Sequence, residues 1–221
     1  MRLATCLSAA TFLACVHQRA LVPAPGAQTL PGQPRVAEET VEGVRVQVDS
    51  AAWRSGQLYD VLSPVRVTIE NGSGRPLRIT YGQFTLGGPS GFRLAALPPY
   101  QAAAADATGG SVGAPPGFVG SGFLVAGPVR NYRGFLPWYG AFPYDPVYYN
   151  RWYGAQPTSL PNVELLRNGL PEGVLQPAGR VSGFLYFKDQ PKGTELRFYA
   201  SLVDAETGQS FGTMSSPFTV Q

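Results

Sequence analysis

The chain has 221 residues, of which 44% are hydrophobic and 12% aromatic, and this is enough apolar material to bury a core in one or two domains. Charged residues make up only 14%, whereas 27 glycines and 21 prolines favour short strands and turns over long helices. The net charge of +3 comes mainly from arginines that are scattered singly along the chain, a distribution that argues against a nucleic-acid partner. We therefore expect an all-β protein that binds no nucleic acid.

The N-terminus carries a short apolar run. Residues 3–14 follow a single arginine and are too few to cross a bilayer of about 30 Å as a helix, so they are typical of an export signal. The following sequence FLAC, residues 12–15, resembles the lipobox of bacterial lipoproteins, with Phe12 where leucine is usual. The resemblance implies that the signal peptide, residues 1–14, is removed and that Cys15 then carries a lipid such as palmitate. Cys6 would be discarded with the signal.

This assignment predicts where the protein resides. A lipid at Cys15 would hold it in the cell envelope, on the outer membrane of a bacterium. The alternative is an ordinary cleaved signal in which the cysteine is accidental, but that would leave an unpaired thiol exposed to oxidation. Residues 15–40 hold four prolines and no steady apolar period, so we expect the lipid anchor to be followed there by a flexible tether.

Residues 41–99 change to a period-two alternation that is typical of half-buried antiparallel strands. The dipeptide Asn71-Gly72 between two such runs predicts a hairpin, because both residues tolerate positive φ. A Gly-Pro turn near residue 88 separates two further short strands. The apolar positions that we expect to face the core are Val44, Val46, Val48, Val65, Val67, Ile69, Leu77, Ile79, Tyr81, Phe84, Leu86, Phe92 and Leu94.

Residues 160–221 repeat this pattern. The run 179–187, the turn KDQPKG and the run 194–204 together predict a hairpin, and a last strand follows the turn DAETG. Leu185 and Phe198 are expected to point into the core, and Arg180 and Arg197 to point outward. The other expected inward residues are Val181, Gly183, Phe187, Leu196, Ala200, Leu202, Phe211, Phe218 and Val220.

Two segments carry a resemblance to a known class of domain. PVRVTIENGSGRPLRITYGQFTL and LQPAGRVSGFLYF resemble strand patterns of immunoglobulin-like domains on exported bacterial lipoproteins of unassigned function. The resemblance implies a two-sheet antiparallel sandwich built from residues 41–99 and 160–221, a length close to the roughly 100 residues that such a sandwich needs. It carries no binding residue with it.

Residues 100–159 form a long insertion rich in glycine, proline and aromatic residues. Ten of the 22 residues from Tyr132 to Tyr153 are aromatic, which is unusual for a solvated linker. The loop could fold back and bury its rings, contact a protein partner or the membrane, or be disordered. Aromatic rings enrich at interfaces, and the candidate partner-binding residues are Trp138, Tyr139, Tyr144, Tyr148, Tyr149, Trp152 and Tyr153.

A second class of function uses the same rings. In a carbohydrate-binding module, Trp138, Trp152 and the tyrosines would stack on the sugars of an envelope polysaccharide, and Asp145, Asn150 and Arg151 would supply hydrogen bonds. Exposed coplanar rings would favour this reading.

Catalysis is not expected. Gly109 to Gly113 match the G-x-S-x-G nucleophile elbow, but the only histidine, His17, precedes it and no later histidine can accept the serine proton. With both cysteines used in export and anchoring, the usual thiol and metal ligands are absent, so we predict no cofactor. A glycosidase with two facing carboxylates is a weaker alternative. The leading hypothesis is a non-catalytic binding or structural module.

Overall fold

The computed structural model describes residues 20–50, 62–99, 102, 133–137, 165 and 168–221. Regular structure in these residues consists of twelve β-strands and a short 3-10 helix, η2 (Tyr81–Gln83). The all-β prediction is confirmed. The strands are β1 (Leu21–Pro23), β2 (Thr29–Leu30), β3 (Gln33–Val41), β4 (Val44–Asp49), β5 (Leu62–Asn71), β6 (Leu77–Ile79), β7 (Phe84–Gly87), β8 (Arg93–Ala95), β9 (Arg133–Pro137), β10 (Gly173–Lys188), β11 (Glu195–Asp204) and β12 (Ser210–Val220).

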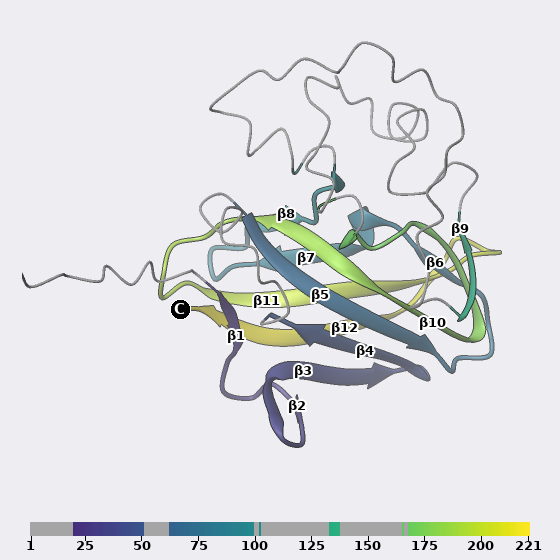
Figure 1. Cartoon of the computed structure of the whole chain (residues 1–221), viewed down its shortest axis with the longest axis horizontal. Helices are drawn as coiled ribbons and strands as arrows, with labels where there is room; N and C mark the ends of the chain where they lie inside the picture. Colours follow the sequence, from purple (N-terminus) through teal and green to yellow (C-terminus); the bar gives the residue numbers. More distant parts are fainter. Residues whose placement is uncertain (1–19, 51–61, 100–101, 103–132, 138–164, 166–167) are drawn as a thin grey trace, which may run out of the picture.

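The strands form one antiparallel sheet that curls until its ends approach each other (Figure 1). The order is β1-β12-β11-β6-β10-β5-β4-β3-β2, and the hairpin of β7 and β8 joins it along β11. Near the seam β3 lies beside β12 without a regular ladder, and the Glu39 carboxylate accepts a hydrogen bond from the Ser215 backbone N–H at 3.0 Å. The sheet is therefore nearly closed into a barrel.

The interior of this barrel is the main hydrophobic core, and the sequence alternation selects the residues that enter it. Leu185 and Phe198 are fully buried, whereas Arg180 and Arg197 are exposed, as predicted. The other predicted inward positions are buried too, except Phe92, Leu94 and Phe211, which are half-buried and pack against the core. The alternation of apolar and polar residues along the sequence thus correctly indicated which face of each strand enters the core.

The predicted hairpin between residues 179–187 and 194–204 is wrong. These segments belong to β10 and β11, which do not pair: β10 pairs with β5, β6 and β9, and β11 with β12, β6 and β7. Their connecting turn instead carries the chain across the core. Phe187 and Phe198 consequently face each other from opposite sides, with ring centroids 6.3 Å apart in an edge-to-face arrangement. Alternation indicates which face is buried and says nothing about which strand lies alongside.

The hairpin predicted at Asn71-Gly72 is also wrong, because β5 and β6 do not pair. The Asn71 side chain is buried and its amide donates to the carbonyl oxygens of Arg75 (2.8 Å) and Leu175 (2.9 Å). The Gly72 N–H donates to the Gly43 carbonyl at 2.9 Å. The Asn71 side chain therefore joins the end of β5 to β10 and to the β5–β6 turn, and it does not form a hairpin turn.

The flexible tether predicted for residues 15–40 is wrong from residue 20 onward. β1 pairs with β12, and β3 pairs with β4 from Val36 onward. Prolines suggested an unstructured chain, but Pro23 ends the edge strand β1 and Pro34 precedes the part of β3 that pairs with β4. Residues 20–40 accordingly belong to the sheet, ahead of the predicted boundary at residue 41.

The predicted insertion, residues 100–159, contains a strand that was not predicted. β9 pairs with β10 through Phe135↔Leu175 and Leu136↔Val174. Phe135 packs against the main core, while Leu136 is 58% exposed on the outer face. This segment is therefore an element of the sheet. The rest of the predicted insertion, apart from Ala102, lies outside the described residues.

Candidate functional site

The residues predicted to carry function lie outside the described residues. These are the lipid-attachment residue Cys15 and the aromatic candidates Trp138, Tyr139, Tyr144, Tyr148, Tyr149, Trp152 and Tyr153. The described residues do show where the segments that carry the rings join the barrel, and what surrounds those junctions.

The junctions meet on the outer face of β10. Tyr186 is fully buried there, although its side chain points away from the main core, and its hydroxyl donates to the Leu165 carbonyl at 2.9 Å. It forms a second apolar cluster, which we call the outer cluster: Leu62, Leu97, Ala102, Leu165, Phe184 and Tyr186. Ala102 and Leu165 precede and follow the aromatic stretch in the chain, so both of its flanks are held at one place.

Backbone contacts reinforce these junctions. The Leu97 N–H donates to the Tyr186 carbonyl at 2.7 Å, and the Leu170 N–H donates to the Phe184 carbonyl at 2.9 Å. β9 adds a third attachment by pairing with the first part of β10. The described parts of the segment between β8 and β10 therefore contact β10 at several points.

Residues 169–172 are locked to η2 by polar groups inside the barrel. The Glu172 carboxylate is 2% exposed and accepts a hydrogen bond from the Tyr81 N–H at 2.8 Å. The Tyr81 hydroxyl donates to the Leu170 carbonyl at 2.6 Å. A Cβ at Gly183 would lie 2.5 Å from the Leu170 Cα, so only glycine allows this close approach. These contacts give a rigid base to the junction.

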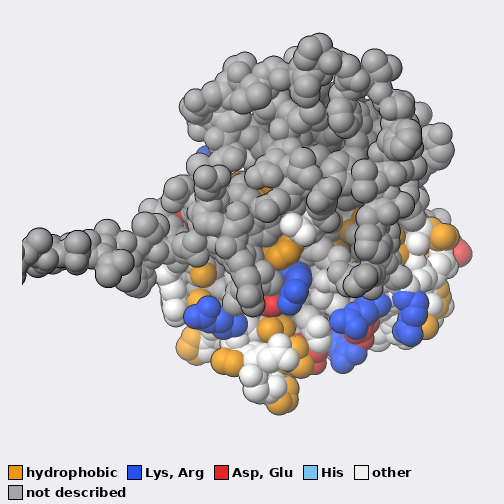
Figure 2. Space-filling model, in the orientation of Figure 1, with side chains coloured by type: hydrophobic (Ala, Val, Ile, Leu, Met, Phe, Trp, Pro, Cys, Tyr) orange, Lys and Arg blue, Asp and Glu red, His pale blue; other side chains and the backbone are white. Residues whose placement is uncertain are grey.

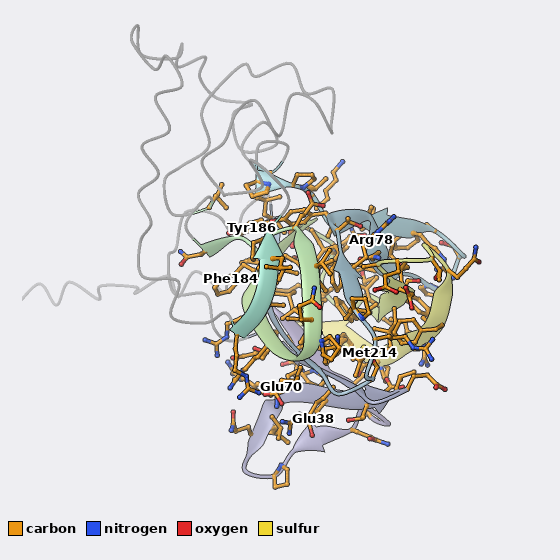
Figure 3. The ribbon with its side chains drawn as sticks, turned by 90° about the vertical axis from the view of Figure 1, so that its right-hand side faces the viewer. Glu38, Glu70, Arg78, Phe184, Tyr186 and Met214 are labelled. Carbon is orange, nitrogen blue, oxygen red and sulfur yellow. The ribbon has the colours of Figure 1, made fainter. Side chains whose placement is uncertain are left out.

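The sequence contains a signal for the outer cluster that the predicted alternation did not use. Phe184, Leu185, Tyr186 and Phe187 are four consecutive apolar residues, and a run without alternation indicates a strand that is covered on both faces. Figure 3 shows Phe184 and Tyr186 at one end of this outer face and Glu70 and Glu38 at the other.

The second part of that outer face is polar, and we call it the polar strip: Glu38, Arg45, Gln47, Asp49, Arg66, Thr68, Glu70, Arg180 and Ser182 from β3, β4, β5 and β10. Glu70 forms ion pairs with Arg45 and, at 3.4 Å, with Arg180. Asp49 pairs with Arg66 at 2.8 Å. The hydrogen bond and the negative charge of Glu70 raise the pKa of the Arg45 guanidinium above its ordinary value.

Polar neighbours on the strip satisfy one another. Gln47 donates to the Glu38 carboxylate at 2.7 Å, and the hydroxyls of Thr68 and Ser182 lie 2.8 Å apart. Three acids balance three arginines within the strip, and Figure 2 shows the two charges intermingled on this face. Because the three arginines already form ion pairs with acids on neighbouring strands, the charges of the strip are better explained by stabilisation of the sheet than by ligand binding.

The outward side chains of β7, β8, β11 and β12 differ from the strip. Arg93 lies over the Tyr199 ring, 4.7 Å from its centroid, and Arg197 donates to the Ser215 hydroxyl at 3.0 Å. In the part of the chain that the structure describes, neither arginine forms an ion pair. We call this surface the arginine face and define it by Thr85, Arg93, Arg197, Tyr199 and Ser215.

Among the described residues, no three His, Cys, Asp or Glu side chains gather closely enough to hold a metal ion. Nor does that part of the chain contain a helix of the length and apolarity needed to cross a membrane. Comparison with protein-family models, with the curated proteins and with the solved structures finds no match to this chain.

Proposed function

We propose that the protein is an exported lipoprotein of the bacterial cell envelope, anchored through Cys15, that acts as a non-catalytic binding or structural module. The sequence FLAC after a short apolar run supports the anchor. The aromatic segment that follows β8 is the proposed contact surface, and its partner is an envelope protein or polysaccharide.

One observation supports that role for the aromatic segment. Ala102 and Leu165, on its two sides, are both fully buried against Tyr186, and β9 within it pairs with β10. A segment secured at its flanks and at one internal strand loses less conformational entropy on binding than a free chain of the same length. The barrel therefore supplies a fixed base for a binding loop.

An immunoglobulin-like sandwich is the finer form of the fold that we propose. Phe187 and Phe198 meet across the core from β10 and β11, and the turn between these strands passes from one side of the core to the other. Such a crossing connection is typical of two packed sheets.

The test compares two sets of substitutions within the same segment. Trp138→Ala with Trp152→Ala should abolish recovery of envelope partners and leave thermal unfolding unchanged. Phe135→Ala is the control, because Phe135 packs on the core and its loss should lower stability. If the tryptophan variant instead unfolds as readily as the Phe135 variant, the rings serve the core and the binding role is wrong. Selective loss of binding to envelope polysaccharide would favour the carbohydrate-binding alternative.

A further inference from the structure

The distance between the proposed lipid and the barrel is short. Ala20 already pairs with the last residue of the chain: its N–H donates to the Gln221 carbonyl at 3.1 Å, and the Gln221 N–H donates back at 2.9 Å. Only residues 16–19 separate Cys15 from Ala20. Fully extended, the link from Cys15 to Ala20 spans at most about 18 Å. A lipid at Cys15 would therefore keep this end of the barrel close to the membrane surface.

Basic residues gather at the same end. Lys188 and Lys192, the only lysines of the chain, flank the turn between β10 and β11, and both are exposed. That turn is bonded to the C-terminal strand, because the Gly193 N–H donates to the Val220 carbonyl at 2.8 Å. Val220 in turn pairs with Leu21 at the start of β1. The lysine turn thus lies beside the point where the link leaves the barrel.

The arginine face continues from this turn. Arg197 is the third residue of β11, and both Arg197 and Arg93 pair with Gly87 on either side of β7. The two arginines therefore project from one row, two strands apart, a separation of about 10 Å. Tyr199 lies between them as an amphipathic ring. Asp189 and Glu195 bring opposing charge to this end, and the Asp189 carboxylate accepts a hydrogen bond from Ser63 at 3.0 Å.

We propose that the arginine face and the lysine turn, which connects β10 and β11, dock on anionic phospholipid headgroups. This inference rests on the lipid anchor proposed at Cys15. Guanidinium groups without acidic partners are free to take phosphate oxygens in bidentate hydrogen bonds. Lysine and tyrosine can extend their polar ends into the headgroup layer. The short link holds these groups at the membrane, where each basic residue near the surface favours docking about fivefold.

An acidic polysaccharide or an acidic protein would present similar charges. We favour the membrane because the short link from Cys15 keeps this end of the barrel next to the headgroups. A soluble polyanion is not held near the arginine face in this way. The polar strip supplies an internal contrast, since its arginines are already paired with Glu70 and Asp49.

The experiment uses the lipidated protein, reconstituted in vesicles of phosphatidylcholine alone or with about one third phosphatidylglycerol. A dye on Lys192→Cys reports the lysine turn, and a dye on Thr207→Cys reports the exposed turn at the far end of β11, about 30 Å away. We expect headgroup-labelled lipid to quench the dye at 192, more strongly in anionic vesicles, and to leave the dye at 207 unaffected. Arg93→Gln with Arg197→Gln should reduce the quenching to the level seen in neutral vesicles.

Arg45→Gln with Arg66→Gln is the matched control, and it should leave the quenching at 192 unchanged. Equal quenching at both dye positions, or quenching that ignores anionic lipid, would overturn the docking. The docking would also be overturned if anionic lipid had no effect on the quenching while a soluble acidic polysaccharide reduced it. Mass spectrometry of the N-terminal peptide shows separately whether Cys15 carries a lipid. If Cys15 is lipidated but the dye at 192 is not quenched, only the docking is rejected. If Cys15 is unmodified, the proposed function is rejected.

Discussion

Two outer faces of the same barrel carry arginines, and they differ in what surrounds those arginines. On the polar strip, Arg45 and Arg180 flank Glu70, the central position of a three-strand row. On the arginine face, the residues beside Arg197 in its row are Gly87 and Pro217, and neither is charged. Residue type alone therefore does not distinguish a charge used within the sheet from one available to a partner. The difference arises from the cross-strand neighbours, which are set by register.

The largest expected effect concerns the core that both faces share. Phe198→Ala removes a ring that contacts Phe84, Phe187 and Phe218. We expect it to lower the free energy of unfolding by about 3 to 5 kcal/mol, as measured by chemical denaturation. Arg197→Ala, one residue away on the arginine face, should change it by less than about 0.5 kcal/mol. A larger effect of the arginine substitution would mean that this face contributes to folding.

An inward glycine of β10 and a glycine of the arginine face allow a second comparison. A Cβ at Gly183, which points into the barrel, would meet the Leu170 backbone, which cannot move alone. A Cβ at Gly87, beside the arginine face, would meet the end of the Tyr199 ring at 3.0 Å, which can rotate away. Gly183→Ala should therefore cost about 1 to 3 kcal/mol, and Gly87→Ala clearly less. Equal losses in thermal unfolding would contradict this difference in rigidity.

A third substitution removes the acid that distinguishes the polar strip. Glu70→Gln leaves Arg45 and Arg180 without the carboxylate that joins them. Because these side chains are 45% and 55% exposed, the loss in unfolding free energy should stay at or below about 1 kcal/mol at low salt. The difference from wild type should fade in about 1 M salt, where the Debye length is about 3 Å. A loss that is insensitive to salt would show that Glu70 acts through hydrogen bonding instead.

The smallest effect is expected at the β11–β12 turn. The backbone N–H groups of Thr207 and Glu206 donate to the Asp204 carboxylate and hold its pKa below the ordinary value. A lowered native pKa stabilises the fold above the unfolded pKa of about 4 and loses that contribution as pH falls through the native value.

Asp204→Ala should therefore lower the melting temperature slightly at pH 7, with the difference from wild type shrinking below about pH 4. Asp204→Asn keeps an oxygen acceptor for the same N–H groups but cannot titrate, so its loss of stability at pH 7 should be smaller than that of the alanine variant and should shrink over the same pH range. A pH-independent loss in the alanine variant would exclude the carboxylate as the cause.

Part of the candidate site could be predicted from the sequence. The aromatic stretch was identified by its composition and the anchor through the resemblance of FLAC to a lipobox, and both stay predictions. The outer cluster was not predicted, because Phe184 and Tyr186 occupy positions that the alternation assigned to solvent. These two side chains are covered by residues that are distant in the sequence, such as Leu97 and Leu165. The local sequence pattern does not show that distant residues pack on this face.

The sequence by itself determined the class of structure and the direction in which side chains point, because strand geometry places alternate residues on opposite faces whatever the neighbouring strand is. Leu185 and Phe198 are buried although the hairpin expected to hold them does not exist. Tertiary structure decided the partners: β10 with β5 rather than β11, and β1 with β12 rather than solvent. Pairing depends on contacts between distant segments and on register, and several partners satisfy the same local pattern. That choice of partners also decides which arginines remain without an acid.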